Sequence, residues 1–150
     1  MKTLEVIYKV KTATVEQILT HLTSCNSNFH PPLTERVNIN GYSQKIFEKS
    51  ITFEAWRGTT LIGLLAAYFN DSSAFITSVS ILKNYMNQSI ASELLRKCIR
   101  HAVKENIREV RLEVNKEDVQ ALGLYRKFDF EVDGINNEFL KMKVDLSPYF

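Results

Sequence analysis

The sequence predicts the α/β class, with an α+β-type mixed sheet of six to seven strands flanked by about four helices. Three observations lead to this prediction. Strand and helix patterns alternate along the chain, three strand patterns follow one another between residues 51 and 81, and a strand–helix–strand crossover spans residues 81–114. The length of 150 residues and the hydrophobic fraction of 45% suit a single domain, residues 1–150.

The composition excludes several classes of function. The 19 basic and 17 acidic residues give a net charge of +2, which argues against a dedicated nucleic-acid binder. The longest apolar run, residues 61–69, is nine residues long, whereas a membrane helix needs about 20. Met1–Val6 lacks the apolar core of a signal peptide. Cys25 and Cys98 cannot form a disulfide framework or a four-ligand zinc site. From these observations together, we expect a cytoplasmic protein with no metal, membrane or nucleic-acid partner.

The beginning of the chain predicts a strand and then a helix. Residues 3–9 alternate apolar and polar side chains with one exception, as in a strand. Thr14 and Gln17 have the spacing of a capping box. The apolar positions that follow repeat as on one helix face: Val15, Ile18, Leu19 and Leu22. Asn26–Asn28 is expected to end this helix.

The centre of the chain predicts a second helix and a meander of three strands. Residues 33–49 have a weaker pattern, which we interpret as a short helical turn and a helix after Asn40-Gly41. The strand patterns that follow are joined by short polar turns and cover residues 51–56, 61–69 and 74–81. Turns this short join antiparallel neighbours.

The strongest periodicity lies in residues 90–103. Their apolar side chains recur at steps of one and three, as on one face of an amphipathic helix: Ile90, Ala91, Leu94, Leu95, Cys98, Ile99, Ala102 and Val103. A strand over residues 109–114 follows. The crossover from Ile81 to Val114 therefore favours a parallel strand pair.

The end of the chain predicts a helix and a strand pair. Asn115 can cap a helix that runs to about Lys127. Residues 128–132 and 138–144 have strand patterns, with a turn expected at Asp133-Gly134. Together these elements have the order β-α-α-β-β-β-α-β-α-β-β.

The start of the helix predicted at residue 90 is a candidate anion site. The first amides of a helix are unpaired, and the helix macrodipole is positive there. The side chains near this helix start, within residues 87–92, are small, so a diphosphate could approach the backbone closely. A plain strand-to-helix loop is the alternative, and from these residues alone it is the commoner outcome.

Three features in order resemble the GNAT family of acetyl-CoA-dependent N-acetyltransferases. A strand ending in Val79-Ser80-Ile81 leads to a loop, Met86–Ala91, at the position of the family's Arg/Gln-x-x-Gly-x-Gly/Ala signature. The strand Leu112–Val114 precedes a helix that carries Ala121–Tyr125. Tyr125–Phe130 corresponds to a family Tyr-x-x-x-Gly-Phe. The resemblance implies a GNAT-like acyl-CoA N-acyltransferase fold.

The resemblance also implies that acetyl-CoA lies between the strands ending at Ile81 and Val114. Backbone groups of Val79 and Ile81 would pair with the pantetheine arm, and helix-start amides would hold the diphosphate. An amide of the same strand would stabilise the thioester oxyanion. The residues implied in binding acetyl-CoA are Val79, Ile81, Met86, Asn87, Gln88, Ser89, Ile90, Ala91, Ser92 and Asn115, of which Asn115 has helix capping as its alternative role.

The chain departs from the family pattern in the loop and before Phe130. Met86 stands where Arg or Gln is usual, Ser89 replaces the first signature glycine, and Asp129 replaces the glycine before Phe130. None of the chain's five glycines lies in this loop: they are Gly41, Gly58, Gly63, Gly123 and Gly134. Asn87 in the loop and Asp129 before Phe130 are of the types that best adopt a left-handed conformation. Because Asn87 suits that conformation and Ser89 is small enough for close approach, we expect the loop to bind pyrophosphate, although less tightly, with loss of binding as the alternative.

Two residues are implied in catalysis. Tyr125 occupies the family position of the group that protonates the departing thiolate, and a tyrosine hydroxyl has a suitable pKa near 10. The alternative is an ordinary core or surface tyrosine. His30 is the candidate general base, because it has a suitable intrinsic pKa, and an ordinary loop histidine beside two prolines is the commoner alternative. Glu54, Asp71 and a water-relayed base are the alternatives, whereas His21 is interpreted as a helix-surface residue.

We expect an enzyme that transfers the acetyl group of acetyl-CoA directly to a primary amine of a small molecule such as an amino sugar, or of a protein N-terminus. Residues 24–50 should form much of the acceptor wall. The alternative from another class is a non-catalytic acyl-CoA-binding or interaction module with the same fold. A third possibility is an unrelated α/β binding domain. We expect a monomer or a homodimer.

Overall fold

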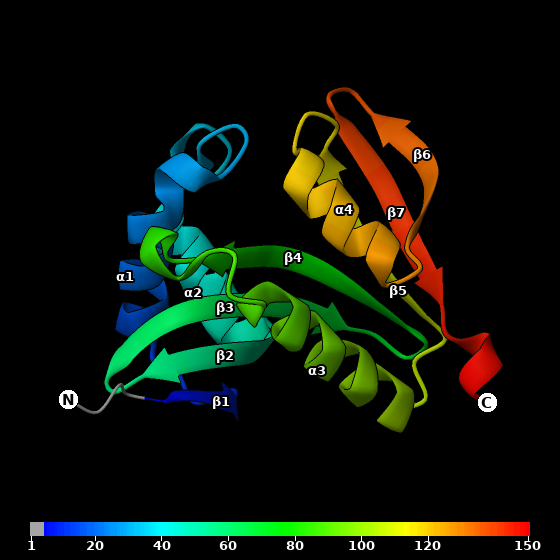
Figure 1. Cartoon of the computed structure of the whole chain (residues 1–150), viewed down its shortest axis with the longest axis horizontal. Helices are drawn as coiled ribbons and strands as arrows, with labels where there is room; N and C mark the ends of the chain where they lie inside the picture. Colours follow the sequence, from blue (N-terminus) through cyan, green and yellow to red (C-terminus); the bar gives the residue numbers. More distant parts are fainter. Residues whose placement is uncertain (1–4) are drawn as a thin grey trace.

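The structure is a computed structural model that describes residues 5–150 and contains a seven-stranded mixed sheet with the strand order β1-β2-β3-β4-β5-β7-β6. In Figure 1 the first four strands and the last three form two wings that meet where β4 lies beside β5. Helix α3 crosses one face of the first wing, α1 and α2 cover the other, and α4 lies against the second wing. No helix within residues 5–150 is both long and apolar enough to cross a bilayer.

The N-terminal elements follow the predicted order. Strand β1 spans Val6–Val10, and the first residues of the strand predicted at 3–9 lie outside the described range. Helix α1, Val15–Cys25, begins with the predicted capping box between Thr14 and Gln17. Short 3-10 turns then occupy Asn26–Asn28 and Leu33–Glu35.

Helix α2, Ile39–Lys49, begins earlier than predicted. The side chain of Asn38 accepts a hydrogen bond from the amide of Gly41 at 2.9 Å and so caps the helix. Asn40 and Gly41 therefore lie in the first turn and do not precede it. Asn40 and Gly41 have poor helix propensity and were therefore predicted to precede the helix, but the N-cap at Asn38 outweighs that propensity.

The predicted meander is confirmed as β2, Ile51–Arg57, β3, Thr60–Phe69, and β4, Ser73–Ile81. Its strands are antiparallel, whereas β4 pairs in parallel with β5, Glu109–Asn115. The connecting helix α3 spans Ile90–Lys104. The crossover predicted from Ile81 to Val114 is thus correct. Its consequence is that the carboxyl ends of β4 and β5 lie at the same edge of the sheet.

The C-terminal elements differ from the prediction in two places. Helix α4, Val119–Lys127, is capped by Asp118 and not by Asn115, whose side chain accepts from the amide of Glu117. The hairpin consists of β6, Glu131–Asn136, and β7, Phe139–Asp145, so the turn predicted at Asp133-Gly134 is wrong. These two residues lie within β6, at a shift in strand register, which indicates that the Asp-Gly pair marks a β-bulge.

Two apolar clusters fix the layers on either side of the sheet. One joins the sheet to the inner faces of α3 and α4 and contains the predicted stripe residues Leu94, Leu95 and Cys98. The other joins Ile18 and Leu22 of α1 to the opposite face. Because both faces are covered, β3 is buried over most of its length, in agreement with its nearly continuous apolar sequence.

Candidate active site

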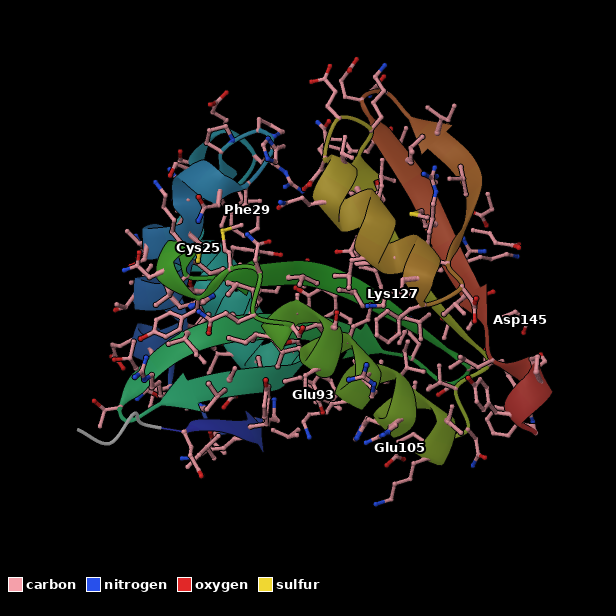
Figure 2. All side chains as sticks on the ribbon, in the orientation of Figure 1. Cys25, Phe29, Glu93, Glu105, Lys127 and Asp145 are labelled. Carbon is pink, nitrogen blue, oxygen red and sulfur yellow. The ribbon has the colours of Figure 1, made fainter. Side chains whose placement is uncertain are left out.

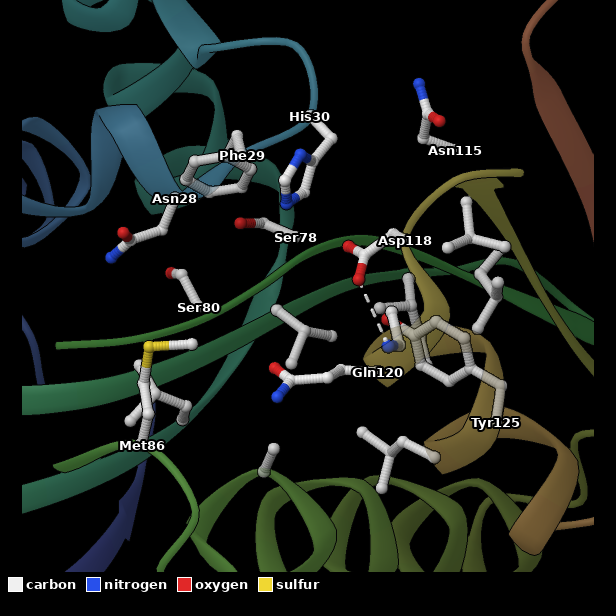
Figure 3. A pocket seen from close by; sticks show the side chains of 18 of the residues that line it. Asn28, Phe29, His30, Ser78, Ser80, Met86, Asn115, Asp118, Gln120 and Tyr125 are labelled. Carbon is white, nitrogen blue, oxygen red and sulfur yellow. Dashed lines mark hydrogen bonds between the residues drawn. The ribbon is translucent and has the colours of Figure 1, made fainter. Parts of the chain in front are cut away.

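A cavity of about 550 Å³ opens where β4 and β5 separate. Figure 3 shows its walls: Asn28, Phe29 and His30 come from the segment after α1, Ser78 and Ser80 from β4, and Asp118 and Tyr125 from α4 and its N-cap. The loop before α3 and the first turn of that helix form the remaining side. The cavity therefore joins segments from both wings of the molecule.

The separation of the two strands is visible in their register. The parallel pairing runs from Ser73 opposite Glu109 to Ile76 opposite Leu112 and stops there, although both strands continue. On the other side, β3 pairs Ala66 with Ser78 and Ala67 with Ile76, so Thr77 is the extra residue of a β-bulge. The residues of β4 after this bulge line the cavity and have no register partner in β5.

The loop before α3 has the geometry of an anion site. Asn87 and Ser89 have left-handed φ angles of 65° and 63°. Ser89 is the N-cap of α3, but its side chain makes no capping hydrogen bond. The first bond of the helix ladder runs from the amide of Glu93 to the carbonyl of Ser89. The amides of residues 90–92 precede that ladder and are available to an anionic ligand.

Most of the residues predicted to bind acetyl-CoA line this cavity. They are Val79, Ile81, Met86, Asn87, Ser89, Ile90, Ala91, Ser92 and Asn115. The side chain of Gln88 is exposed and does not contribute to the lining. The prediction that Asn87 and Asp129 take left-handed angles is confirmed, with φ of 65° and 69°.

A glycine outside the loop brings the loop close to the sheet. Gly63 in β3 lies below the start of α3, and a Cβ atom there would come 3.0 Å from side-chain atoms of both Ile81 and Ile90. Ile81 ends β4 and Ile90 begins α3, so the two ends of the loop converge on this glycine. The close approach needed for the anion site therefore depends on a residue that the loop signature does not include.

Tyr125 lies in the cavity wall and is 7% exposed. Burial, with a smaller contribution from the nearby charge of Asp118, raises the pKa of its phenol well above the ordinary value of 10. Its ring packs obliquely against Phe130, with the centroids 5.7 Å apart. The hydroxyl is therefore protonated at neutral pH, but it is a weaker acid than the value near 10 on which its predicted role as a proton donor was based.

His30 lies at the opposite wall, exposed to solvent, with its ring directed into the space above β4 (Figure 3). Phe29 lines the same wall. Side chains from this segment and from the α4 side reach toward each other across the gap in Figure 2, and the guanidinium of Arg36 lies 5.0 Å from the ring centroid of Phe139 in β7. Arg36 and Phe139 both line the cavity, so this contact bridges two sides of its wall.

Two carboxylates in the cavity lining were not predicted as candidate bases. Glu113 is an exposed residue of β5 whose Oε1 accepts from Asn136 at 3.2 Å. Asp118 accepts from the amide of Ala121 at 3.2 Å, the interaction dashed in Figure 3. The predicted parallel crossover could have indicated Glu113 from the sequence. Glu113 lies near the carboxyl end of the strand that follows the crossover, and ligand sites in such sheets form at the carboxyl ends of strands.

Two of the alternative bases lie elsewhere. Asp71 is in the β3–β4 turn and does not line the cavity. Glu54 is fully buried in β2, where Thr12, Ala13, Thr52 and Trp56 all donate hydrogen bonds to its carboxylate. Burial raises the pKa of Glu54, but these donors outweigh it and hold the pKa below its ordinary value. Glu54 therefore ties the segment before α1 to the sheet.

His21 is not a surface residue, contrary to the prediction, because it is only 2% exposed. Its Nδ1 lies 2.8 Å from the carbonyl of Leu61 and must carry the proton, so Nε2 accepts from the hydroxyl of Ser80 at 2.9 Å. Burial lowers the pKa of His21, and the carbonyls of Leu61 and Ser80, which would both accept from the charged ring, oppose this in part. The apolar stripe of α1 could not reveal this role, which depends on partners in β3 and β4.

The two thiols are unsuited to nucleophilic chemistry. Cys25 and Cys98 are both fully buried, and burial raises their pKa values to about 11 and about 12. Both are therefore protonated near neutral pH. Within residues 5–150 no three His, Cys, Asp or Glu side chains are grouped so that they could hold a metal ion.

Comparisons with known proteins agree with this geometry. The sequence model described as the acetyltransferase (GNAT) family matches residues 15–130. A Bacillus subtilis (strain 168) protein named as a [ribosomal protein bS18]-alanine N-acetyltransferase is 29% identical over 79 residues. That match spans 53% of this chain and about half, 52%, of the relative.

Solved structures show the same fold. The ribosomal-protein-S18-alanine N-acetyltransferase from Escherichia coli has a TM-score of 0.78 at 14% identity, with 95% of each chain covered. The PaiA N-acetyltransferase from Thermoplasma acidophilum, solved in complex with coenzyme A, has a TM-score of 0.73 at 15% identity, covering 93% of this chain and 99% of that one. At these identities the comparison establishes the fold.

Proposed function

Since this chain belongs to the GNAT family of acetyltransferases, we propose that it transfers the acetyl group of acetyl-CoA directly to a primary amine, first of all the α-amine of a protein N-terminus. One observation carries the proposal. The cavity where β4 and β5 separate contains a helix N-terminus suited to a diphosphate and the buried hydroxyl of Tyr125. The protein relative named above is the reason for placing a protein N-terminus ahead of a small-molecule amine such as an amino sugar.

The residues present fit acetyl-CoA. The amides of residues 87–92 would hold the diphosphate, because two left-handed residues and an uncapped helix start direct them toward the cavity. The edge of β4 from Val79 to Ile81, no longer paired with β5, would bind the pantetheine arm as a short strand. Met86 and Asn115 would contact the cosubstrate from either side of the opening.

In the proposed reaction the acceptor nitrogen loses two protons. The acceptor arrives as an ammonium ion and gives one proton to His30. His30 is exposed to solvent and lies in the cavity wall formed by the segment after α1. The neutral amine attacks the thioester carbonyl, and an amide of β4 stabilises the oxyanion. When the carbon–sulfur bond breaks, Tyr125 donates its proton to the thiolate and regains one as the new amide nitrogen loses its remaining extra proton. Glu113 favours the approach of the ammonium ion through its negative charge.

A second function, a non-catalytic acyl-CoA-binding module, is favoured by Met86 and Ser89 in the signature loop. Either function would occupy a single domain spanning residues 1–150, acting as a monomer or a homodimer. The two functions share the cosubstrate site and differ only in turnover. One experiment on the full chain can therefore separate them.

The test begins with thermal unfolding in the presence of acetyl-CoA, CoA or ATP. Acetyl-CoA at 100 times its dissociation constant should stabilise the chain by about 2.7 kcal/mol. The second step measures thiol release with a peptide that has a free α-amine, with its N-acetylated form containing lysine, and with an amino sugar. Release only with the free α-amine supports the proposal. Stabilisation without release from any amine supports the non-catalytic module, and no stabilisation contradicts both.

A further inference from the structure

The bulge residue Thr77 lies outside the regular pairing of the sheet. Thr77 has no partner in the pairing of β3 with β4, and the pairing of β4 with β5 ends one residue earlier, at Ile76. A carbonyl outside the regular pairing at the edge of a core needs a hydrogen-bond partner, because an unpaired buried carbonyl is destabilising. The conformation of the bulge therefore depends on what that carbonyl contacts.

Its partner is Tyr42 of α2. The hydroxyl of Tyr42 donates a hydrogen bond to the carbonyl of Thr77 at 2.8 Å, and the Thr77 hydroxyl lies 2.6 Å from the same phenol oxygen. With one hydrogen on each group, Tyr42 donates to the carbonyl and Thr77 donates to Tyr42. Burial raises the pKa of Tyr42 to about 12, so the phenol keeps its proton at every pH at which the protein would be assayed.

The position of Tyr42 is set by the segment that forms the acceptor wall. This segment, residues 26–38, contains Phe29, His30 and Arg36 of the cavity lining and ends at Asn38, the N-cap of α2. Tyr42 is in the first turn of that helix, and its amide bonds the carbonyl of Asn38 at 2.9 Å. Its ring packs against the apolar cluster on the α1 and α2 face of the sheet. A displacement of the acceptor wall is therefore transmitted to the bulge through one side chain.

We propose that Tyr42 is a positioning residue for the acetyl transfer, which holds the bulge at Thr77 in the shape that directs the strand amide at the thioester oxyanion. This inference rests on the proposed function and adds a role for a helix that does not carry any of the predicted site residues. Tyr42 is not among the residues that line the cavity. It acts through the backbone of β4, and so it links the acceptor wall to the reacting carbonyl.

Tyr42→Phe removes the phenol oxygen and keeps the ring. We expect kcat to fall about tenfold while the KM for acetyl-CoA changes less than twofold, because the diphosphate and pantetheine contacts lie beyond the bulge. Removal of one oxyanion donor lowers kcat by about 10²–10³, and a donor that is displaced but not lost should cost less. Thr77→Val, which keeps the carbonyl contact and loses the side-chain contact, should give a smaller loss.

Ser43→Ala is the matched control. Ser43 is the next residue of the same helix, is fully buried, and has a hydroxyl without a hydrogen-bond partner among the described residues. Its replacement also removes one hydroxyl from α2 but leaves the bulge untouched, so kcat and KM should match the unaltered chain. A loss of kcat in Tyr42→Phe with no loss in Ser43→Ala supports the proposal.

Three results would overturn it. They are an unchanged kcat in Tyr42→Phe, an equal loss in Ser43→Ala, and a rise in the KM for acetyl-CoA that accounts for the whole effect in Tyr42→Phe. Thermal midpoints of all variants are measured first, and assays are run well below the lowest. The proposed function fails separately, since in that case the unaltered chain releases no thiol with any amine.

Discussion

At the scale of single residues, Tyr125 carries the clearest chemical prediction. Tyr125→Phe should lower kcat about 10²-fold or more, because general acid catalysis typically contributes 10²–10⁴. Thiol release under saturating acetyl-CoA measures this, and acetyl-CoA should stabilise the variant as much as the unaltered chain. The ring, which packs on Phe130, is retained. Unchanged turnover would remove Tyr125 from the proton-donor role.

His21 makes stability depend on pH. Its pKa is near 6.5 in the unfolded chain and lower in the fold, so the unfolded state binds more protons below pH 6.5. The contribution of the neutral side chain is complete above pH 6.5 and is lost as the pH falls toward the folded pKa, by at most about 1.4 kcal/mol per pH unit. Glu54, whose folded pKa is lowered, contributes a loss only below its ordinary value of 4.5.

The measurement is urea unfolding at several values between pH 5 and pH 7. The free energy of unfolding should decrease with acidity in this range. His21→Leu should be less stable, because it leaves the Ser80 hydroxyl and the Leu61 carbonyl without their partner, but its pH dependence between 5 and 7 should be much weaker. His30→Gln, a change at an exposed histidine, should retain the dependence of the unaltered chain.

At the scale of elements, Gly63 and Gly123 provide a test substitution and its matched control. In Gly63→Ala the new methyl group would come 3.0 Å from Ile81 and Ile90 and 3.3 Å from the Cβ atom of Ala55, which pushes α3 away from the sheet. We expect the dissociation constant for acetyl-CoA to rise severalfold, because the amides at the helix start move with it. Equilibrium binding of acetyl-CoA measures the change.

Gly123→Ala is the control for this pair. Gly123 is in the middle of α4, and a Cβ atom there would have no neighbour within 4 Å. The substitution should stabilise the chain by about 0.5–1 kcal/mol, since alanine favours the helix more than glycine does. Its affinity for acetyl-CoA should be unchanged. Equal affinities in the two variants would show that Gly63 does not set the position of the loop.

At the scale of the whole molecule, the arrangement of layers was predictable and the contacts between distant segments were not. The periodicity of residues 90–103 predicted α3 because one face of that helix is buried over its full length. The cavity residues on β4, α3 and α4 were predicted because the family signature covers that part of the chain. His21, Glu54 and Tyr42 were misread or missed because their roles depend on partners that lie 35 to 59 residues away.

The same limit applies to helix and turn boundaries. Asn38 and Asp118 were not predicted as caps, because a cap is defined by the angle at which the chain enters the helix and not by composition alone. Asp133-Gly134 has the sequence of a hairpin turn and forms a bulge, because the register of β7 against β5 places the turn after Asn136. At Asp133-Gly134, local turn propensity was overridden by pairing across the sheet.

The contact of Arg36 with Phe139 joins the two wings and carries a prediction of its own. A cation–π contact at an exposed site is worth about 0.5–1 kcal/mol, so Arg36→Ala should barely change stability. It should, however, raise acetylation of an internal lysine relative to a free α-amine. Competition between two peptides, analysed by mass spectrometry, measures this ratio. An unaltered ratio would show that the contact does not select the acceptor.

Because Arg36 and Phe139 both line the cavity, their contact would convert an open groove into a closed opening at this side. An open groove accepts the middle of a chain laid across it, whereas a closed opening admits only a free chain end. Selection for the end of a polypeptide would then follow from connectivity, without a pocket shaped for any one side chain. Because the Arg36–Phe139 contact is weak, it would also let the acetylated chain end leave through the same opening.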